Sequence, residues 1–136
     1  ENTLELYFQS CSLTLKTPDL ARLGALLAHG GTAIDGGAQH LQRSTVRNVL
    51  TVMSTCGMYN FSGEFAFRIG LPAKSGVSGA LLLIVPGVMG LAIWSPPLDE
   101  YGNTVRGVRL CQELVKRLPL HAYERWPSIP WAENTD

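Results

Sequence analysis

The sequence predicts an α+β fold in which helices flank an antiparallel sheet. Two apolar runs, residues 80–85 and 88–94, contain no polar side chain, which is typical of strands covered on both faces. Pro86-Gly87 lies between them and indicates a turn, so the two runs are predicted to form a central hairpin. Helical patterns precede this hairpin and one follows it, and that order of elements favours the α+β class.

The opening segment is predicted to be the end of a native helix. Residues 6–10, Leu-Tyr-Phe-Gln-Ser, resemble an engineered protease-cleavage tag, but residues 3–5 interrupt the tag pattern and no linker precedes Cys11. We therefore favour a helix over a tag and expect the sequence to start inside a structure.

The next helix is predicted to start at Thr17-Pro18-Asp19, where a hydroxyl cap is followed by proline and an acid. Gly30-Gly31 is expected to end it. Its predicted buried face consists of Leu20, Leu23 and Leu27, with Leu26 beside them.

A second helix is predicted after a glycine-containing loop at residues 32–42, with Ser44 as its cap. Residues 56–60 break it, and residues 62–69 are predicted to form a short helix with Phe65 and Phe67 among its apolar contacts, a strand being the alternative. The apolar positions of the second helix are Val46, Val49, Leu50 and Met53.

The last helix is predicted to begin at Gly102-Asn103 and to end at Pro119. Residues 119–136 have three prolines, two tryptophans and no periodicity, and are predicted to be a surface tail or a linker. Because one terminal helix cannot cover both faces of the hairpin, part of the domain is expected to lie outside this sequence. The apolar stripe of the last helix is Val105, Val108, Cys111, Leu114, Val115 and Leu118.

The composition argues against several function classes. Eleven basic and eleven acidic residues cancel, which argues against nucleic acid or an acidic membrane as a partner, and no apolar run is long enough to span a bilayer. Cys11, Cys56 and Cys111 are widely spaced and odd in number, so we expect three buried, reduced thiols in a cytosolic protein. The three histidines have no ligand spacing, so no metal site is predicted.

The residues that indicate chemistry lie just before the hairpin. Gly76, Ser78 and Gly79 leave the backbone uncovered beside Lys74, which favours binding of a polar or anionic group. Lys74-Ser75-Gly76 also fits the Lys-[Ser/Thr]-Gly triplet of penicillin-binding proteins and serine β-lactamases, which opens a strand. No GxSxG surrounds Ser78, and the acidic pair at residues 99–100 is interpreted as a solvated turn.

Longer segments resemble the serine-dependent glutaminases. The resemblance rests on residues 54–79, STCGMYNFSGEFAFRIGLPAKSGVSG, on residues 94–99 and 102–103, and on residues 6–12 and 27–31. It covers residues 4–118 and implies a β-lactamase/transpeptidase-like fold. Residues 1–118 are then expected to be the C-terminal half of the catalytic domain, and residues 119–136 a tail or linker.

The resemblance implies hydrolysis of L-glutamine to L-glutamate and ammonia through a serine acyl-enzyme, without a cofactor. The family's nucleophile belongs to a Ser-x-x-Lys motif, which this sequence lacks, so it is expected in a missing N-terminal half. A homo-oligomer in the cytoplasm, or in mitochondria if the source is a eukaryote, is also expected.

The site residues implied by the resemblance are Tyr7, Tyr59, Lys74, Ser75 and Val77. Tyr7 matches a substrate-contacting tyrosine, and Tyr59 a tyrosine beside the nucleophile that contacts substrate and carries a proton. The Val77 N–H matches a donor to the substrate carbonyl, while Lys74 and Ser75 are expected to shape the electric field of the site. Without the resemblance, these side chains would be interpreted as a core aromatic (Tyr7), a turn aromatic (Tyr59) and a strand residue (Val77).

Two alternatives remain at this stage. The chain could be a non-catalytic binding or scaffold module of the same fold that lost its nucleophile. It could also belong to another amidohydrolase that recognises penicillin-like substrates. The intact Tyr59 and Lys-Ser-Gly-Val run argue against the first, and the glutaminase spacing argues against the second.

Overall fold

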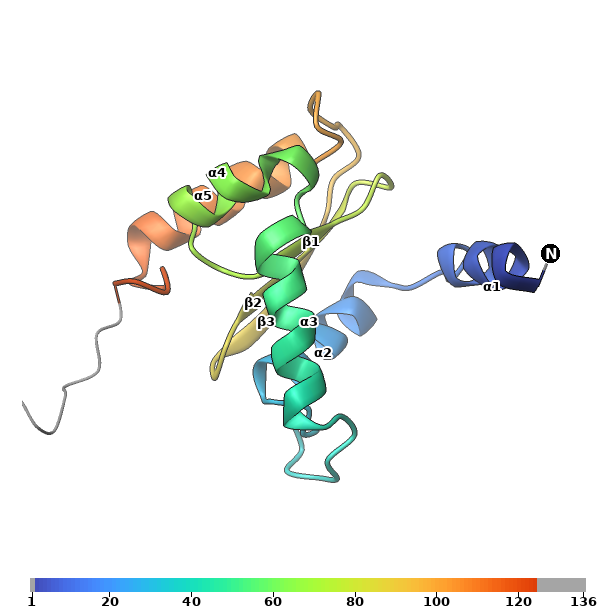
Figure 1. Ribbon diagram of the computed structural model, residues 1–136. Coiled ribbons are helices and arrows are strands. Elements are labelled where there is room, and N and C mark those ends of the chain that lie inside the picture. The colour runs from blue at the N-terminus through green and yellow to red at the C-terminus, as the bar shows by residue number, and fades with distance from the viewer. Residues whose placement is uncertain (1, 125–136) are drawn as a thin grey trace, which may run out of the picture.

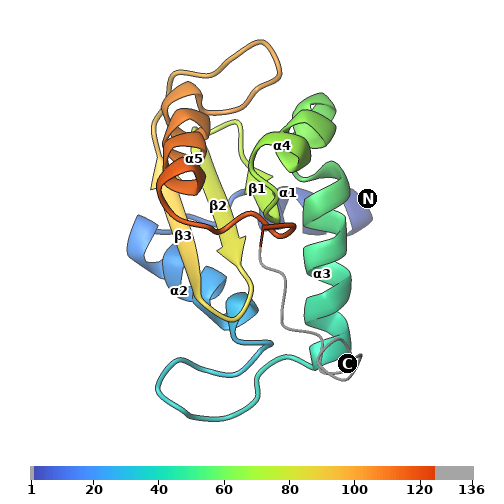
Figure 2. The same cartoon turned by 90° about the vertical axis from the view of Figure 1, so that its left-hand side faces the viewer.

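The computed structural model describes residues 2–124 and has a three-stranded antiparallel sheet with helices on both faces (Figures 1 and 2). The strands are β1 (Ala73–Ser75), β2 (Ala80–Val85) and β3 (Met89–Trp94), in the order β1-β2-β3. The predicted α+β class and central hairpin are thus confirmed, with Ala80 opposite Trp94 and Val85 opposite Met89.

The sequence suggested that the Lys-Ser-Gly triplet opens the long strand, but in the structure it does not. Lys74 and Ser75 form the separate strand β1, which pairs with β2 so that Lys74 lies opposite Leu82. The chain reverses between the two strands at residues 76–79, because Gly79 adopts a φ of 89°, a conformation that side chains other than glycine rarely take.

Strand β2 is the centre of the molecule, and its side chains alternate between two cores. Leu81, Leu83 and Val85 enter the larger core, while Leu82 and Ile84 enter the smaller one. The larger core also contains Met58, Phe65, Ile69, Leu71, Ala73, Val108, Cys111 and Leu120, and the smaller one Leu27, Ala28, Val46 and Met53.

The helices are α1 (Asn2–Cys11), α2 (Thr17–Ala28), α3 (Arg43–Cys56), α4 (Ser62–Arg68) and α5 (Val105–Arg117), with a 3₁₀ turn, η1 (Tyr59–Phe61), between α3 and α4. Helices α2 and α3 supply the smaller core, and α4 and α5 supply the larger one on the opposite face of the sheet (Figure 2). Helix α2 thus adds a second layer that the sequence argument had not counted, although none of the residues of β3 is fully buried.

The helix starts differ from prediction by one or two residues. Thr17 lies inside α2, whose N-cap is Lys16, and Ser44 lies inside α3, whose N-cap is Gln42. Neither cap residue makes a side-chain cap bond. Helix α5 begins after Thr104 rather than at Gly102-Asn103, because the Thr104 hydroxyl accepts a hydrogen bond from the Gly107 N–H at 3.2 Å.

Helix α2 packs on β3 through a pair of glycines. A side-chain carbon added to Gly24 would lie 3.0 Å from the Gly90 Cα and 2.8 Å from Leu82 Cδ1. One added to Gly90 would overlap the Gly24 backbone. The prediction that Leu23 lies on the buried face was wrong: Leu23 is 43% exposed, since Gly24 occupies the contact position.

Other apolar positions also face solvent, where no element covers them. Val49, Val105 and Leu118 are exposed, as is Phe67, which is 85% exposed and was wrongly placed among the contacts of α4. All three cysteines are free, as predicted, but Cys11 and Cys56 are exposed and only Cys111 is buried.

The two ends of the described chain differ in how they contact the rest of the molecule. Helix α1 confirms the predicted N-terminal helix, but none of its residues is buried and it projects away from the sheet (Figure 1). At the other end, Leu120 enters the larger core and the Ala122 N–H donates to the Gly70 carbonyl at 3.1 Å, so residues 120 and 122 pack against the domain. The rest of the predicted tail, residues 125–136, lies outside the described residues.

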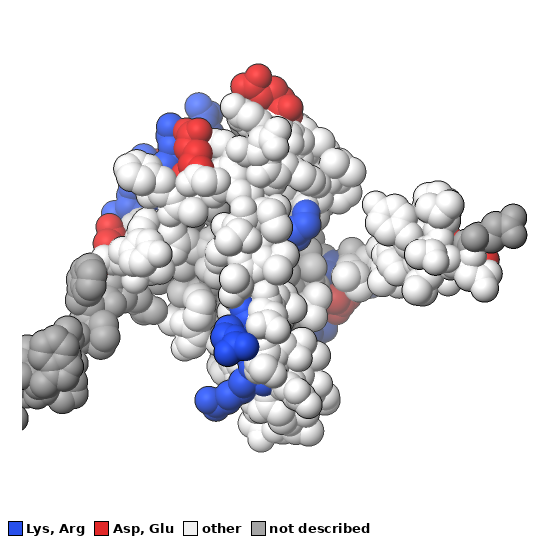
Figure 3. Space-filling view, viewed as in Figure 1, with Lys and Arg blue, Asp and Glu red and all other residues white. Residues whose placement is uncertain are grey.

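On the face drawn in Figure 3, the charged side chains of the described residues do not all have one sign. On the face drawn in Figure 3, basic groups occur in small separate clusters, and acidic groups lie among those near the top. Within residues 2–124, none of the helices has the length and apolar character needed to cross a bilayer.

Candidate active site

Tyr59 stands out by its backbone. It begins η1, shortly after α3 ends at Cys56, and its φ of 55° makes it the only residue other than glycine with a positive φ among residues 2–124. Such a conformation costs on the order of 1–3 kcal/mol and persists only where the surroundings enforce it. Its side chain is 40% exposed, so the ring remains accessible from solvent.

The Tyr59 hydroxyl points to strand β1. It donates to the Ser75 carbonyl at 3.4 Å, and the Lys74 ammonium donates to the same oxygen. Lys74 Nζ also lies 4.8 Å from the centroid of the Tyr59 ring, within range of a cation–π interaction. Burial at this position lowers the pKa of Lys74, because an ammonium loses hydration there, and the nearby Cys56 thiol partly opposes the shift.

Val77 lies in a turn and not in a strand, contrary to what its sequence neighbours suggest. The Gly79 N–H donates to the Gly76 carbonyl at 2.9 Å, which makes residues 76–79 a four-residue turn with Val77 second. Trp94 Nε1 holds the turn by donating to the Ser78 carbonyl at 3.0 Å. Val77 is 74% exposed, and no described residue accepts a hydrogen bond from its N–H.

A third segment brings Tyr59 and Val77 together. A side-chain carbon added to Gly102 would lie 3.8 Å from Tyr59 Cε2 and 4.0 Å from Val77 Cγ1, so Gly102 lies between the two residues. Asp99 shapes this segment by accepting from the N–H groups of Tyr101 and Asn103, each at 2.9 Å. The sequence analysis had dismissed Asp99 as part of a solvated turn, whereas its carboxylate orders the loop.

Sequence analysis also missed Ser62 and Asn103 as site residues. Both are buried, and both hydrogen-bond the backbone around Tyr59. A serine three residues after Tyr59 is a weak signal for such a contact, and nothing in the sequence indicates that Asn103 reaches back to Met58.

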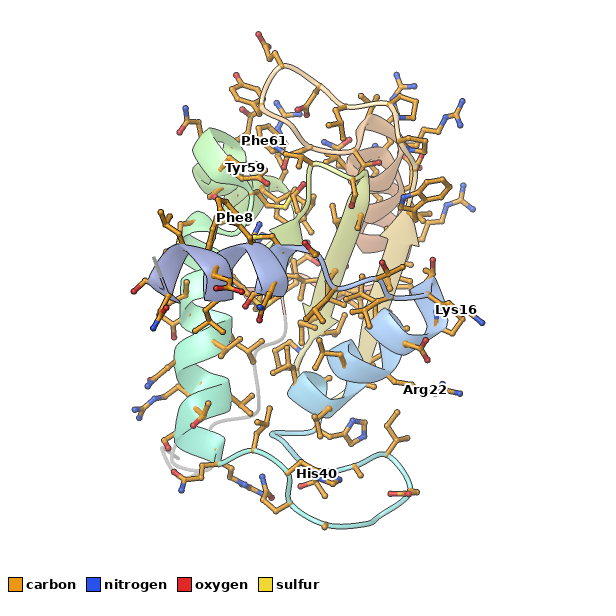
Figure 4. All side chains as sticks on the ribbon, turned by 90° about the vertical axis from the view of Figure 1, so that its right-hand side faces the viewer. Phe8, Lys16, Arg22, His40, Tyr59 and Phe61 are labelled. Carbon is orange, nitrogen blue, oxygen red and sulfur yellow. The ribbon has the colours of Figure 1, made fainter. Side chains whose placement is uncertain are left out.

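The structure does not place Tyr7 with the other predicted site residues. Tyr7 lies on α1 and is 62% exposed. Phe8 of the same helix overlaps Tyr59 and Phe61 in Figure 4, but Figure 1 shows α1 away from the sheet and helices. The role of Tyr7 therefore stays a prediction.

His40 lies away from Tyr59. Figure 4 shows His40 in the loop between α2 and α3, at the opposite end of the molecule. Among residues 2–124, no group of three or more His, Cys, Asp or Glu side chains is arranged to hold a metal ion.

A sequence model of the glutaminase family matches residues 1–123. The chain belongs to the glutaminase family. It is 48% identical over 124 residues to a glutaminase of Nostoc sp., covering 91% of this chain and 37% of that protein. It is also 50% identical over 121 residues to the mitochondrial liver isoform of mouse glutaminase, covering 89% of this chain and 20% of that protein.

Solved glutaminase structures share the fold. A probable glutaminase from Bacillus subtilis, complexed with 6-diazo-5-oxo-L-norleucine, superposes with a TM-score of 0.85 at 36% identity, over 88% of this chain and 42% of that one. The β-lactamase-like fold implied by the resemblance is thereby confirmed. This glutaminase sequence spans well under half the length of each of these relatives.

Proposed function

We propose that this chain is part of a glutaminase that hydrolyses L-glutamine to L-glutamate and ammonia through a serine acyl-enzyme. The observation that carries the proposal is that Tyr59 contacts Lys74 and lies beside the same loop glycine, Gly102, as Val77, in a member of this family. The Bacillus subtilis relative is complexed with an analogue of glutamine, which supports the substrate.

The proposed division of labour follows from the chemistry of amide hydrolysis. A serine from a Ser-x-x-Lys segment, which is absent from residues 1–136, attacks the carboxamide carbon. Tyr59, acting as its phenolate, accepts the serine proton and passes it to the nitrogen that leaves as ammonia. A water molecule then attacks the acyl-enzyme, gives a proton back to the serine oxygen through Tyr59, and releases L-glutamate. The Val77 N–H donates to the oxyanion that forms on the carboxamide oxygen. Lys74 stabilises negative charge on the Tyr59 oxygen, and Tyr7 contacts the substrate from outside this cluster.

The domain assignment and cellular context remain part of the proposal. Residues 1–118 form the C-terminal half of the catalytic domain, and residues 119–136 form a tail or linker that packs against it at residues 120 and 122. The name of the mouse relative supports a mitochondrial location if the source is a eukaryote, with the cytoplasm otherwise. The complete enzyme assembles as a homo-oligomer.

The test is an enzyme completed with a known Ser-x-x-Lys portion. In this completed enzyme, residues 1–123 replace the matched segment of the Nostoc relative. We expect it to release ammonia from L-glutamine, and Tyr59→Phe to lower kcat by roughly 10²–10⁴-fold, the usual contribution of general acid–base catalysis, with a smaller change in KM.

Tyr123→Phe is the matched control, because it removes a hydroxyl from an exposed tyrosine outside the Tyr59 cluster. It should retain the parent kcat. A completed enzyme that folds and releases no ammonia, while the Nostoc relative is active under the same conditions, would favour the non-catalytic module.

A further inference from the structure

We propose that Ser62 and Asn103 are positioning residues that hold Tyr59 in its left-handed conformation and so fix the place of its hydroxyl. This proposal deepens the glutaminase function above and rests on it for its kinetic consequence. Both residues are buried, and their side chains hydrogen-bond the backbone at Met58 and Tyr59.

The backbone of Tyr59 needs support from both sides. Its φ of 55° is set by the orientation of the peptide group before its Cα relative to the one after it. An L-residue with a bulky side chain leaves this region unless neighbouring groups hold both peptide groups.

Ser62 holds the peptide group after Tyr59. Its hydroxyl donates to the Tyr59 carbonyl at 2.7 Å and accepts from the Met58 N–H at 3.0 Å. The Ser62 hydroxyl oxygen therefore connects the Met58 N–H to the Tyr59 carbonyl. The bond from the Met58 N–H is buried and the bond to the Tyr59 carbonyl is part-buried, so losing the Ser62 hydroxyl would leave a buried donor without its partner.

Asn103 holds the peptide group before Tyr59. Its Nδ2 donates to the Met58 carbonyl at 3.3 Å, and the residue is fully buried. The Phe61 N–H also donates to this carbonyl, at 3.1 Å. The peptide group between Met58 and Tyr59 is thus fixed by a side chain from a distant segment as well as by its own turn.

Asn103 is itself fixed. Asp99 accepts from its backbone N–H at 2.9 Å, and the Tyr101 ring of the same loop stacks on Phe61 with centroids 5.6 Å apart and planes at 25°. Figure 4 shows Phe61 next to Tyr59, at the end of the molecule where this loop lies. The loop at residues 99–103 and the η1 turn therefore form one unit, and displacing Asn103 would move both.

The consequence concerns where the Tyr59 oxygen lies. With its backbone held, the ring extends under Lys74 and the hydroxyl reaches the Ser75 carbonyl. A tyrosine with an ordinary negative φ would direct its ring elsewhere, because its Cα–Cβ bond would point in a different direction.

A double-mutant cycle in the completed enzyme tests the proposal. Because an ångström of misplacement can cost about 10²-fold in rate, we expect Ser62→Ala to lower kcat by ~10–100-fold with KM changed less than ~3-fold. In a Tyr59→Phe background the same substitution should change kcat by less than ~3-fold, since the hydroxyl it positions is gone. Ser62→Thr keeps the hydroxyl and should restore most of the rate.

Thr51→Ala is the matched control, because the Thr51 hydroxyl donates to the Arg47 carbonyl at 2.8 Å on the exposed side of α3, away from Tyr59. Its small effect should be the same in both backgrounds. An equal loss from Ser62→Ala with and without the Tyr59 hydroxyl, or no loss at all, would overturn the proposal.

A structural measurement separates this proposal from the proposed function. In a crystal structure of the Ser62→Ala chain, Tyr59 should leave the positive φ region or its hydroxyl should leave the Ser75 carbonyl. An unchanged Tyr59 would refute the positioning role even if the enzyme is a glutaminase, and a displaced Tyr59 would support it even if the completed enzyme is inactive. If Ser62→Ala does not fold, as judged by thermal melting, Asn103→Ala carries the same measurements.

Discussion

In the proposed mechanism, Val77 contributes its backbone N–H and not its side chain. Its N–H has no acceptor among the described residues, and it is the second residue of the turn at residues 76–79. Proline is favoured at this position of common turns, and Gly76 before it tolerates the restriction that proline imposes. Replacement by proline therefore deletes one hydrogen-bond donor with little damage to the fold.

The first prediction compares two substitutions at Val77 in the completed enzyme. Val77→Pro should lower kcat by about 10²–10³-fold, the cost of losing one oxyanion donor. Val77→Ala keeps the N–H and should lower kcat only slightly. The measurements are steady-state kinetics on variants whose melting temperatures show that they are folded. Similar kcat values for the two would exclude the Val77 N–H as an oxyanion donor.

Cys111 is a buried thiol on the inner face of α5. Burial raises its pKa to about 12 from an ordinary 9.0, because the thiolate would lack hydration in the core. Between these two values the unfolded chain releases a proton that the folded chain keeps, so rising pH favours unfolding. The stabilisation is complete below pH 9 and is lost as the pH approaches 12.

The second prediction follows from that shift. The free energy of unfolding should fall by up to about 1.4 kcal/mol per pH unit through this range on account of Cys111. Urea unfolding at a series of pH values measures the slope. Cys111→Ala lacks the titrating group, so its slope should be shallower by that amount; parallel slopes would show that Cys111 does not stay protonated.

At the residue level, the resemblance predicted the candidate site residues but not the contacts that fix their positions. Tyr59, Lys74 and Val77 follow from matching segments. The positive φ of Tyr59 and the contact of Asn103 with Met58 could not be predicted. Asn103 and Met58 are 45 residues apart in the sequence, and no local pattern indicates that they meet.

Among the elements, α2 and β3 pack backbone against backbone. Gly24 and Gly90 let the helix backbone meet the strand backbone directly. Both glycines are therefore required by space and not by turn geometry, since neither has a positive φ.

The third prediction ranks three glycine-to-alanine substitutions by their effect on stability. Gly90→Ala should be the most destabilising, because its methyl group would overlap the Gly24 backbone, and Gly24→Ala should cost roughly 1–3 kcal/mol of overpacking. Gly63→Ala is the control: its methyl group meets nothing within 4 Å, and alanine favours helix by up to about 1 kcal/mol. Thermal melting measures all three, and equal effects would contradict the packing described.

Prediction of the elements succeeded where periodicity was strong. The hairpin, the helices α2 to α5 and the glycine stop after α2 were predicted, because apolar spacing and glycine act locally. Strand β1 was missed, since three residues carry too little pattern and it is stabilised by pairing with β2. The exposure of Leu23 was missed because the sequence does not indicate that a glycine would form the contact.

At the scale of the whole molecule, the sequence lacks the Ser-x-x-Lys motif that the proposed mechanism requires. The chain spans 37% of the Nostoc glutaminase, and none of its serines is followed by lysine three residues later. Tyr59 and Val77 would then assist a nucleophile that another segment must supply.

The fourth prediction is that the 136-residue chain alone releases no ammonia from L-glutamine. Adding the portion of the Nostoc relative that this chain does not match, as a separate polypeptide or joined to the chain, should restore turnover. A coupled ammonia assay measures both. Turnover by the purified chain on its own would refute the proposed mechanism.

The glycine contact between α2 and β3 also bears on how the chain reaches its fold. The three strands are joined by short turns and can pair locally, whereas docking of α2 must close a long loop before any contact repays the lost entropy. Until that loop closes, Leu82 and Ile84 on the α2 side of β2 lack their cover and are exposed to water. The refolding rate, and the tendency to aggregate during refolding, should therefore respond to changes in the α2 contact more than to changes in the hairpin turn.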